Sequence, residues 1–161
     1  MPTAVSQSPN PLATGARREQ NPRLLLAIAL VALAGIAVSS ISLYHHFATT
    51  KTSFCNFGES FNCDIVNRSG YSTVLGVPVA LIGILGYLLI LALATVYRDK
   101  LETPILLLVT TVAGLGFALY LTYIEKFVLF TWCILCLSSL ALILAEAVLS
   151  GALARSSVEK R

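Results

Sequence analysis

Four long apolar runs limit what this chain can fold into. They cover residues 24–44, 77–97, 104–124 and 127–152 of the 161 residues. Crossing a hydrocarbon layer of about 30 Å takes about 20 residues of helix, and each run is about that long. Membrane β-strands would be about ten residues long and would alternate apolar with polar side chains, whereas these runs are continuous. We therefore predict an all-α membrane protein, a bundle of four transmembrane helices with one long outer loop at 45–76.

The composition agrees with this fold class, because 57% of the residues are hydrophobic and only 12% are charged. Residues 1–22 carry Pro and many polar side chains with no apolar periodicity, which is typical of a disordered segment. We predict one membrane domain at 23–153, between a cytoplasmic tail at 1–22 and a second cytoplasmic tail at 154–161.

The basic residues predict the orientation in the membrane. Of the 11 Lys and Arg residues, eight lie in or directly beside the two tails or in the turn after the second run, and three lie in the segments on the other side. Cytoplasmic segments carry the excess of Lys and Arg, so both termini should be cytoplasmic and all four cysteines should lie on the outer side. This placement accounts for the net charge of +3 without a nucleic acid partner.

A Cys-x-x-Cys motif, Cys133 and Cys136, stands near the start of the fourth run. Two residues at i and i+3 of a helix lie about 5–6 Å apart on one face, which a disulfide tolerates. If the helix begins near Phe127, the thiols lie in its first two turns, where the helix dipole favours a thiolate. We predict a redox pair, with two packed, inert thiols as the alternative.

A second pair, Cys55 and Cys63, lies in the outer loop. Eight extended residues would span about 26 Å, whereas a disulfide needs Cα atoms within about 7 Å, so a bridge requires the loop to fold back, with Gly58 as the expected bend. Disulfides persist in an oxidising compartment. From the spacing alone, a permanent staple and a redox-active bridge are both open.

Two kinds of polar residue occur at the ends or inside the runs. His45 and His46 end the first run, and we interpret them as interfacial anchors rather than metal ligands, since the chain has no other His. Glu146 is the only acid well inside a run, and acids there are functional suspects. A packing or hydrogen-bonding role, or an interfacial position, is the interpretation we prefer.

Small and aromatic residues mark further features of the runs. Glu125 and Lys126 are expected to form a tight outer turn between the third and fourth helices. The aromatics around this turn would either border a molecule bound beside the cysteines or form an interfacial belt. The glycines would permit close helix packing, with a cofactor site as the alternative for Gly83 and Gly86. These residues are Phe127, Phe130 and Trp132, and Gly83, Gly86, Gly114 and Gly116.

The order of motifs resembles the vitamin K epoxide reductase family over about residues 24–149. The resemblance rests on the Cys-x7-Cys loop, on Ser72-Thr-Val-Leu-Gly76 before the second run, on Ala118-Leu-Tyr-Leu-Thr-Tyr-Ile124 at the end of the third, and on Cys133-Ile-Leu-Cys136. The short stretch between Cys63 and Ser72 resembles bacterial members, which implies a multi-pass protein of the bacterial inner membrane that supports disulfide formation.

The resemblance also implies roles. Cys55 would exchange with a thioredoxin-fold partner, Cys63 would pass electrons to Cys133, and Cys136 would meet a quinone, ubiquinone or menaquinone. Ser72 stands where the family keeps a polar residue that hydrogen-bonds a quinone carbonyl. Many bacterial members carry a fused thioredoxin-like domain, and the printed chain ends at Arg161 without one, which implies a separate partner.

Leu140 departs from the family pattern, because vertebrate members have a Tyr at this position. The resemblance therefore does not identify the residue that would hydrogen-bond the second carbonyl of the quinone.

Three alternatives compete with this function. A DsbB-type quinone-coupled oxidase performs a similar reaction, but its two cysteine pairs come in the opposite order. A thiolate metal-binding protein usually has Cys-x2-Cys on both arms of the site, which Cys-x7-Cys does not match. A structural membrane protein with two static disulfides is the third alternative.

Overall fold

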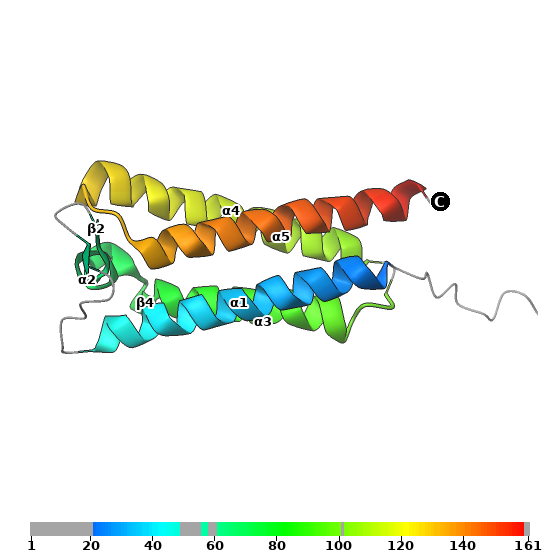
Figure 1. Cartoon of the computed structure of the whole chain (residues 1–161), viewed down its shortest axis with the longest axis horizontal. Coiled ribbons are helices and arrows are strands. Elements are labelled where there is room, and N and C mark those ends of the chain that lie inside the picture. Colours follow the sequence, from blue (N-terminus) through cyan, green and yellow to red (C-terminus); the bar gives the residue numbers. More distant parts are fainter. Residues whose placement is uncertain (1–20, 49–55, 58–60, 101, 160–161) are drawn as a thin grey trace, which may run out of the picture.

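The computed structural model describes residues 21–48, 56–57, 61–100 and 102–159. Four long helices run side by side: α1 (Pro22–Phe47), α3 (Val79–Thr95), α4 (Thr103–Ile124) and α5 (Ile134–Glu159). Figure 1 shows the start of α1 and the end of α5 at one end of the bundle and the small elements at the other. The predicted helical bundle is thus confirmed in its class.

Three segments of the described part are long and apolar enough to cross a membrane. They are Pro22–Phe47, Thr103–Leu129 and Ile134–Val158, whereas Val79–Thr95 is a shorter apolar helix of 17 residues. The second helix was expected over 77–97. It begins later because Val77 and Pro78 form the short strand β4 (Val77–Pro78), which pairs with β3 (Thr73–Val74).

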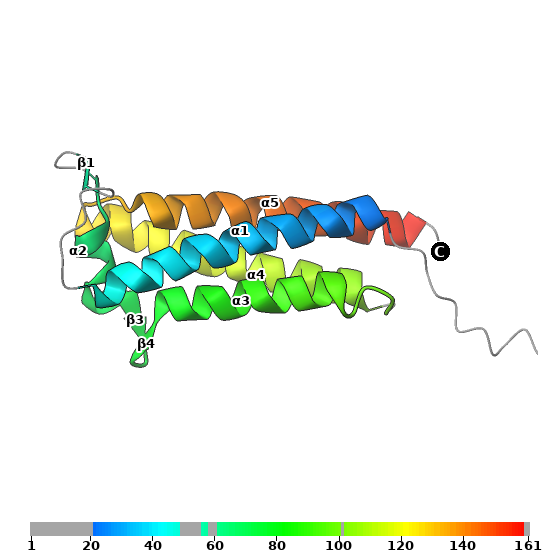
Figure 2. The same cartoon turned by 60° about the horizontal axis from the view of Figure 1, so that its bottom comes forward.

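The small elements cap one end of the bundle, as Figures 1 and 2 show together. Strands β1 (Asn56–Phe57) and β2 (Phe61–Asn62) pair antiparallel and lead into the short helix α2 (Cys63–Asn67). The 3-10 turn η2 (Gly70–Ser72) follows and leads to the β3–β4 hairpin. Leu75 and Gly76 make the hairpin turn with positive φ angles of 53° and 82°.

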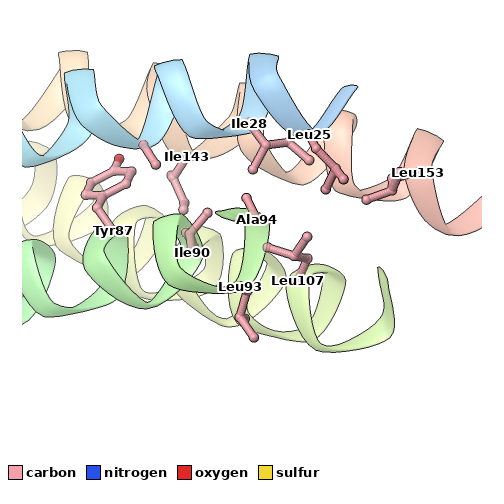
Figure 3. Close-up of a cluster of buried hydrophobic side chains, with 10 residues drawn as sticks. Leu25, Ile28, Tyr87, Ile90, Leu93, Ala94, Leu107, Ile143 and Leu153 are labelled. Carbon is pink, nitrogen blue, oxygen red and sulfur yellow. The ribbon is translucent and has the colours of Figure 1, made fainter. Parts of the chain in front are cut away.

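The helices pack as two layers that share a continuous apolar core. Helix α1 packs against α3 and α5, and α4 packs against α5. Figure 3 shows side chains from these helices meeting between the layers. The buried members of this core are Leu25, Ile28, Ala32, Tyr87, Ile90, Leu93, Ala94, Leu107, Ile143 and Leu153.

Two helices approach each other closely at Gly35 of α1. A Cβ atom there would lie 2.5 Å from Cδ1 of Tyr87, far inside van der Waals contact. Among the four glycines expected to permit close packing, Gly83 and Gly114 lie against Ser39 and Ile143, at 3.0 and 3.2 Å from an added Cβ. Gly86 and Gly116 have nothing within 4 Å of that position, so the packing role predicted for them is wrong.

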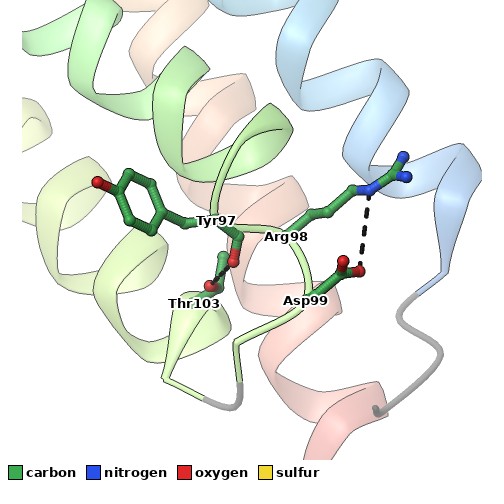
Figure 4. A network of polar contacts seen from close by, with 4 residues as sticks. All are labelled: Tyr97, Arg98, Asp99 and Thr103. Atoms are coloured by element: carbon green, nitrogen blue, oxygen red, sulfur yellow. Dashed lines mark hydrogen bonds and ion pairs between the residues drawn. The ribbon is translucent and has the colours of Figure 1, made fainter.

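Polar contacts hold the connection between α3 and α4, at the end of the bundle where α1 starts and α5 ends. Figure 4 shows Thr103 Oγ1 donating to the backbone carbonyl of Tyr97, and Arg98 beside Asp99. The Arg98–Asp99 pair is exposed, with 3.8 Å between Nε and Oδ1, so it contributes little stability.

The fourth helix begins later and ends later than predicted. Helix α4 continues into a π-helical turn, η3 (Glu125–Leu129), which ends at Phe130 in a left-handed conformation with φ of 51°. Helix α5 therefore starts at Ile134 instead of Phe127, and it runs to Glu159 through most of the expected tail at 154–161. Residues 1–20, most of the predicted N-terminal tail, lie outside the described residues.

Candidate active site

The Cys-x-x-Cys pair lies at the N-terminus of α5. Cys133 directly precedes the helix and Cys136 lies in its first turn, and both thiols are free. The backbone carbonyl of Cys133 accepts from Leu137 N at 3.0 Å, which joins Cys133 to the helix. Cys133 is fully buried, whereas Cys136 is partly exposed. The two thiols therefore differ in access although they are three residues apart.

Cys63, the first residue of α2, is packed into the same buried cluster as Cys133. The cluster consists of Cys63, Val66, Cys133 and Leu135, with Cys136 packed against it. A backbone hydrogen bond of 3.1 Å from Asn62 N to the Trp132 carbonyl, next to a bridge between Phe61 and Trp132, holds the two segments together. Cys63 is disulfide-bonded, and Cys55 lies outside the described residues.

Glu125 is a residue of this site that the sequence reasoning placed in an outer turn. It begins the π-helical turn η3, and it is 1% exposed. Its Oε2 accepts a hydrogen bond from the backbone N–H of Cys133 at 3.2 Å. One carboxylate oxygen of Glu125 and the sulfurs of Cys133 and Cys136 all lie within 4.8 Å of one another. A carboxylate thus stands beside the redox pair.

The local environment makes the Cys133 thiol more acidic. The hydrogen bond with the Cys136 thiol lowers the pKa of Cys133, against the opposing effects of burial and of the Glu125 charge. A thiolate is the reactive form of cysteine and also the better leaving group. Cys133 is therefore suited to leave when a disulfide at its sulfur is cleaved.

A largely apolar cavity of about 370 Å³ opens beside the pair. It is lined by side chains from all four long helices, and Cys136 and Glu125 contribute to its wall, whereas Cys133 does not. Its size lies in the range of small-molecule sites, about 300–1,000 Å³. Tyr87 closes another part of the wall, with its hydroxyl donating to the Ser139 carbonyl at 3.0 Å.

A polar group forms one side of the cavity, and it contains the predicted site residue Ser72. Ser72 Oγ donates to the Ser69 carbonyl at 2.7 Å and lies 3.4 Å from His46 Nδ1. Asn67 is 6% exposed, and its Oδ1 accepts from Ser42 Oγ at 2.8 Å. Its Nδ2 is buried without a hydrogen-bond partner in the described part of the chain, so this amide group, in a residue of the cavity wall, has unused donors.

His46 is part of this polar group. Its Nδ1 contacts the Asn67 carbonyl at 2.5 Å, and its side chain lines the cavity. The interpretation of His46 as a simple interfacial anchor therefore misses its inward contact.

Several predicted neighbours of an acceptor lie elsewhere. The aromatics Phe127, Phe130 and Trp132 are not in the cavity wall, and Phe127 and Phe130 are exposed. Leu140 packs against the apolar core.

Glu146 is completely buried in the middle of α5. Both of its oxygens lack a hydrogen-bond partner among the described residues. Because α5 continues well beyond it, to Glu159, the interfacial position is wrong.

The donor set beside the cavity is also one that could hold a metal ion. It comprises two thiols and one carboxylate, whereas structural zinc sites in proteins have four ligands. Thiol and carboxylate groups at this spacing support thiol chemistry equally well, so the geometry alone leaves both uses open.

A comparison with protein-family models favours the thiol chemistry. The model described as the vitamin K epoxide reductase family matches residues 26–150. The match covers the cap, all of α3 and α4, most of α1 and α5, and every candidate site residue described above.

Proposed function

Because the chain belongs to the vitamin K epoxide reductase family, a family of membrane oxidoreductases, we propose that it oxidises a thioredoxin-fold partner on the outer side of the membrane. The electrons would pass through two cysteine pairs to a membrane quinone. The observation that carries this proposal is the packing of Cys63 with Cys133 in one buried cluster, while Cys136 opens into the cavity.

The burial of each sulfur supports an order of transfer. In this order, the partner's thiols reduce the disulfide of Cys63 and Cys55. The Cys63 thiolate then attacks Cys133 in the oxidised pair of Cys133 and Cys136, which we call the rim pair. This attack forms a mixed disulfide and releases the Cys136 thiolate. Cys55 then attacks Cys63 and restores the loop disulfide, and Cys133 leaves as a thiolate. The lowered pKa of Cys133 favours this last step.

The cavity fits a quinone headgroup in size and character. The quinone, when bound, accepts two electrons and two protons. Ser72 and Asn67 line the same side of the cavity and would supply polar groups for one carbonyl. The Ser72 hydroxyl already donates to the Ser69 carbonyl, whereas Nδ2 of Asn67 has no partner among the described residues and could donate without losing an existing bond. Cys136 stands on the wall of the same cavity, where its sulfur would meet the ring.

We extend the proposal to four spans with cytoplasmic termini. Helix α3 has 17 residues, the lower limit for crossing a bilayer. Arg23 lies at the start of α1, Arg98 and Lys100 follow α3, and Arg155 lies in the last turns of α5, whereas Arg68 follows α2 and Lys126 lies in η3. Figure 1 shows these ends of α1, α3 and α5 opposite the cap. This distribution supports an outer position for the cap and its thiols.

The test compares cysteine variants with two reductants. Cys133→Ala and Cys136→Ala should each abolish quinone reduction by any thiol, because neither leaves a closable pair. Cys55→Ala and Cys63→Ala should stop oxidation of a thioredoxin-fold protein but retain quinone reduction by a small membrane-permeant dithiol that reaches Cys136 through the cavity. Loop variants as inactive with the small dithiol as the rim variants would contradict the order of transfer.

A metal-binding function is the second candidate, and the closeness of Glu125, Cys133 and Cys136 favours it. Purified protein with reduced thiols should contain far less than stoichiometric zinc or copper if the redox function is correct. Stoichiometric metal that protects both rim thiols from alkylation would support the metal function instead.

A further inference from the structure

Glu125 has no task in the transfer of electrons described above, yet its carboxylate lies beside the reacting sulfurs. A buried carboxylate is costly unless it is fully hydrogen-bonded. Its carboxylate is hydrogen-bonded to the N–H of Cys133 and to the Cys136 thiol, and Oε1 has no partner among the described residues. Within the same part of the chain, it forms no ion pair. A purely structural role would be served as well by a neutral side chain.

The backbone holds Glu125 in place. Its carbonyl accepts from Phe130 N and from Thr131 N, the latter at 3.2 Å, and these bonds close the π-helical turn. Such turns are rare and frequently occur at functional sites. Together with the bond to Cys133 N, they fix the carboxylate between the end of η3 and the start of α5.

The carboxylate also reaches the place where protons must move. Glu125 and Cys136 both line the cavity, and a Glu125 oxygen lies within 4.8 Å of both sulfurs. Quinone reduction by two thiols forms one disulfide and transfers two electrons and two protons. The sulfurs supply both protons, and Cys133 is sealed from the cavity.

We propose that Glu125 is a catalytic proton carrier between the rim thiols and the acceptor. Its carboxylate takes the proton of each rim thiol in turn, as that sulfur gives up its proton, and passes each proton to an oxygen of the reduced acceptor. Two thiols and one quinone thus become one disulfide and one hydroquinone, and Glu125 returns to its starting form. This role rests on the proposed function, but the sharing of a proton with a thiol can be tested without a quinone.

The first experiment measures how fast Cys136 is alkylated as the pH is raised. A Cys133→Ala background removes the second rim thiol and keeps the N–H that bonds Glu125. With Glu125 present, the Cys136 thiol and the carboxylate together hold two protons at low pH. The alkylation rate of Cys136 should therefore rise in two steps as the pH is raised, one step for the loss of each proton. Adding Glu125→Gln should leave a single step, while Glu125→Asp should retain two.

Other titratable groups remain the same in these variants. On the neighbouring elements they are His46 of α1, Asp64 of α2 and Tyr87 of α3, and on η3 itself Lys126, with Tyr71 of η2 also in the cavity wall. A difference between the profiles with and without the Glu125→Gln change therefore reports on the carboxylate. Unfolding temperatures are measured for all variants in parallel. We expect Glu125→Gln to keep the fold, because its amide oxygen can accept the hydrogen bond from Cys133 N.

The second experiment measures quinone reduction in protein with all four cysteines. General acid–base groups contribute about 10²- to 10⁴-fold to rates, so Glu125→Gln should slow quinone reduction by a factor in that range. Glu125→Ala should be partly rescued by added formate, which can enter the cavity and carry protons. The matched control is Glu102→Gln, an exposed acid before α4, which should change the rate by no more than about twofold.

The two readouts separate failure of this inference from failure of the proposed function. If wild-type protein reduces no quinone but the alkylation profile loses a step on Glu125→Gln, the proposed acceptor is wrong and the proton sharing stands. Identical alkylation profiles with and without the carboxylate would overturn the role of Glu125, whatever the quinone activity.

Discussion

The contact between Gly35 and Tyr87 gives a prediction whose size follows from the structure. In Gly35→Ala, the new Cβ would lie 2.5 Å from Cδ1 and Cζ of Tyr87. Carbon atoms in contact are about 3.5–4.0 Å apart, so the ring must move by about 1 Å. The ring is 4% exposed and is held by the bond from its hydroxyl to Ser139. The cavity is the open space beside it.

Three contributions set the expected change in the free energy of unfolding. Overpacking costs about 1–3 kcal/mol, and loss of the Tyr87 hydroxyl bond costs about 0.5–1.5 kcal/mol. Replacing a helical Gly by Ala returns about 1 kcal/mol. Gly35→Ala should therefore destabilise the protein by about 0.5–3.5 kcal/mol, from the sum of these ranges. Quinone affinity should fall as well, because the displaced ring occupies cavity space.

The assay is reversible unfolding in mixed micelles with increasing SDS, with Gly116→Ala as the control. Gly116 is a helical glycine of α4 with nothing within 4 Å of an added Cβ, so this variant should be neutral or slightly more stable. A double-mutant cycle with Tyr87→Leu should show that the cost of Gly35→Ala depends on the ring. If Gly35→Ala unfolds like Gly116→Ala and binds quinone normally, the close packing of α1 on α3 is wrong.

The remaining predictions test the site and its orientation. Ser72→Ala should weaken quinone use by about 2- to 13-fold, the value of one neutral hydrogen bond, with normal exchange between partner and loop; unchanged quinone dependence would remove Ser72 from the site. In intact cells, a membrane-impermeant reagent should label reduced Cys55 or Cys63 while tags on both termini stay shielded, and a terminal tag labelled from outside would reverse the topology. In Cys136→Ala, the Cys133 thiol loses the hydrogen bond that lowers its pKa, so its pKa should rise and its alkylation at neutral pH should slow; the argument fails if the pH midpoint stays where it is.

The class of fold and the position of the reactive thiols could be predicted from the sequence because both depend on strong, local patterns. Long apolar runs can be satisfied in a membrane only by helices or closed barrels, and the runs lack alternation. The Cys-x-x-Cys spacing likewise brings two sulfurs together at a helix start. Both features hold in the structure, although Cys133 lies just before α5 and not inside its first turns.

Helix boundaries were less predictable, since they depend on backbone conformations without a clear sequence signal. Phe130 adopts a left-handed conformation, which is uncommon for an aromatic residue, so nothing in the apolar run at 127–152 indicates a break. Val77 and Pro78 look like a helix start, yet they pair with β3 in a hairpin.

Glu125 was missed because a Glu-Lys pair between two apolar runs has the appearance of an exposed turn. Its burial results from the π-helical turn and from the return of the chain at Thr131, which are tertiary features. The available signal was its position shortly before Cys133, in a hairpin that must bring the two close. Gly35 was missed for a related reason, since a glycine in an apolar run does not reveal which face meets a neighbouring helix.

The short length of α3 has a consequence for the surrounding lipid. At 1.5 Å per residue, its 17 residues rise about 26 Å, whereas the 26 residues of α1 and of α5 rise about 39 Å. On the proposal that all four helices span, the bundle has one short side, and hydrophobic mismatch there costs a fraction of a kcal/mol per Å. The β3–β4 hairpin ends where α3 begins, and Leu75 at its tip is fully exposed. The bilayer should therefore be thinnest beside α3, which shortens the distance a lipid-soluble acceptor must rise to reach the cavity.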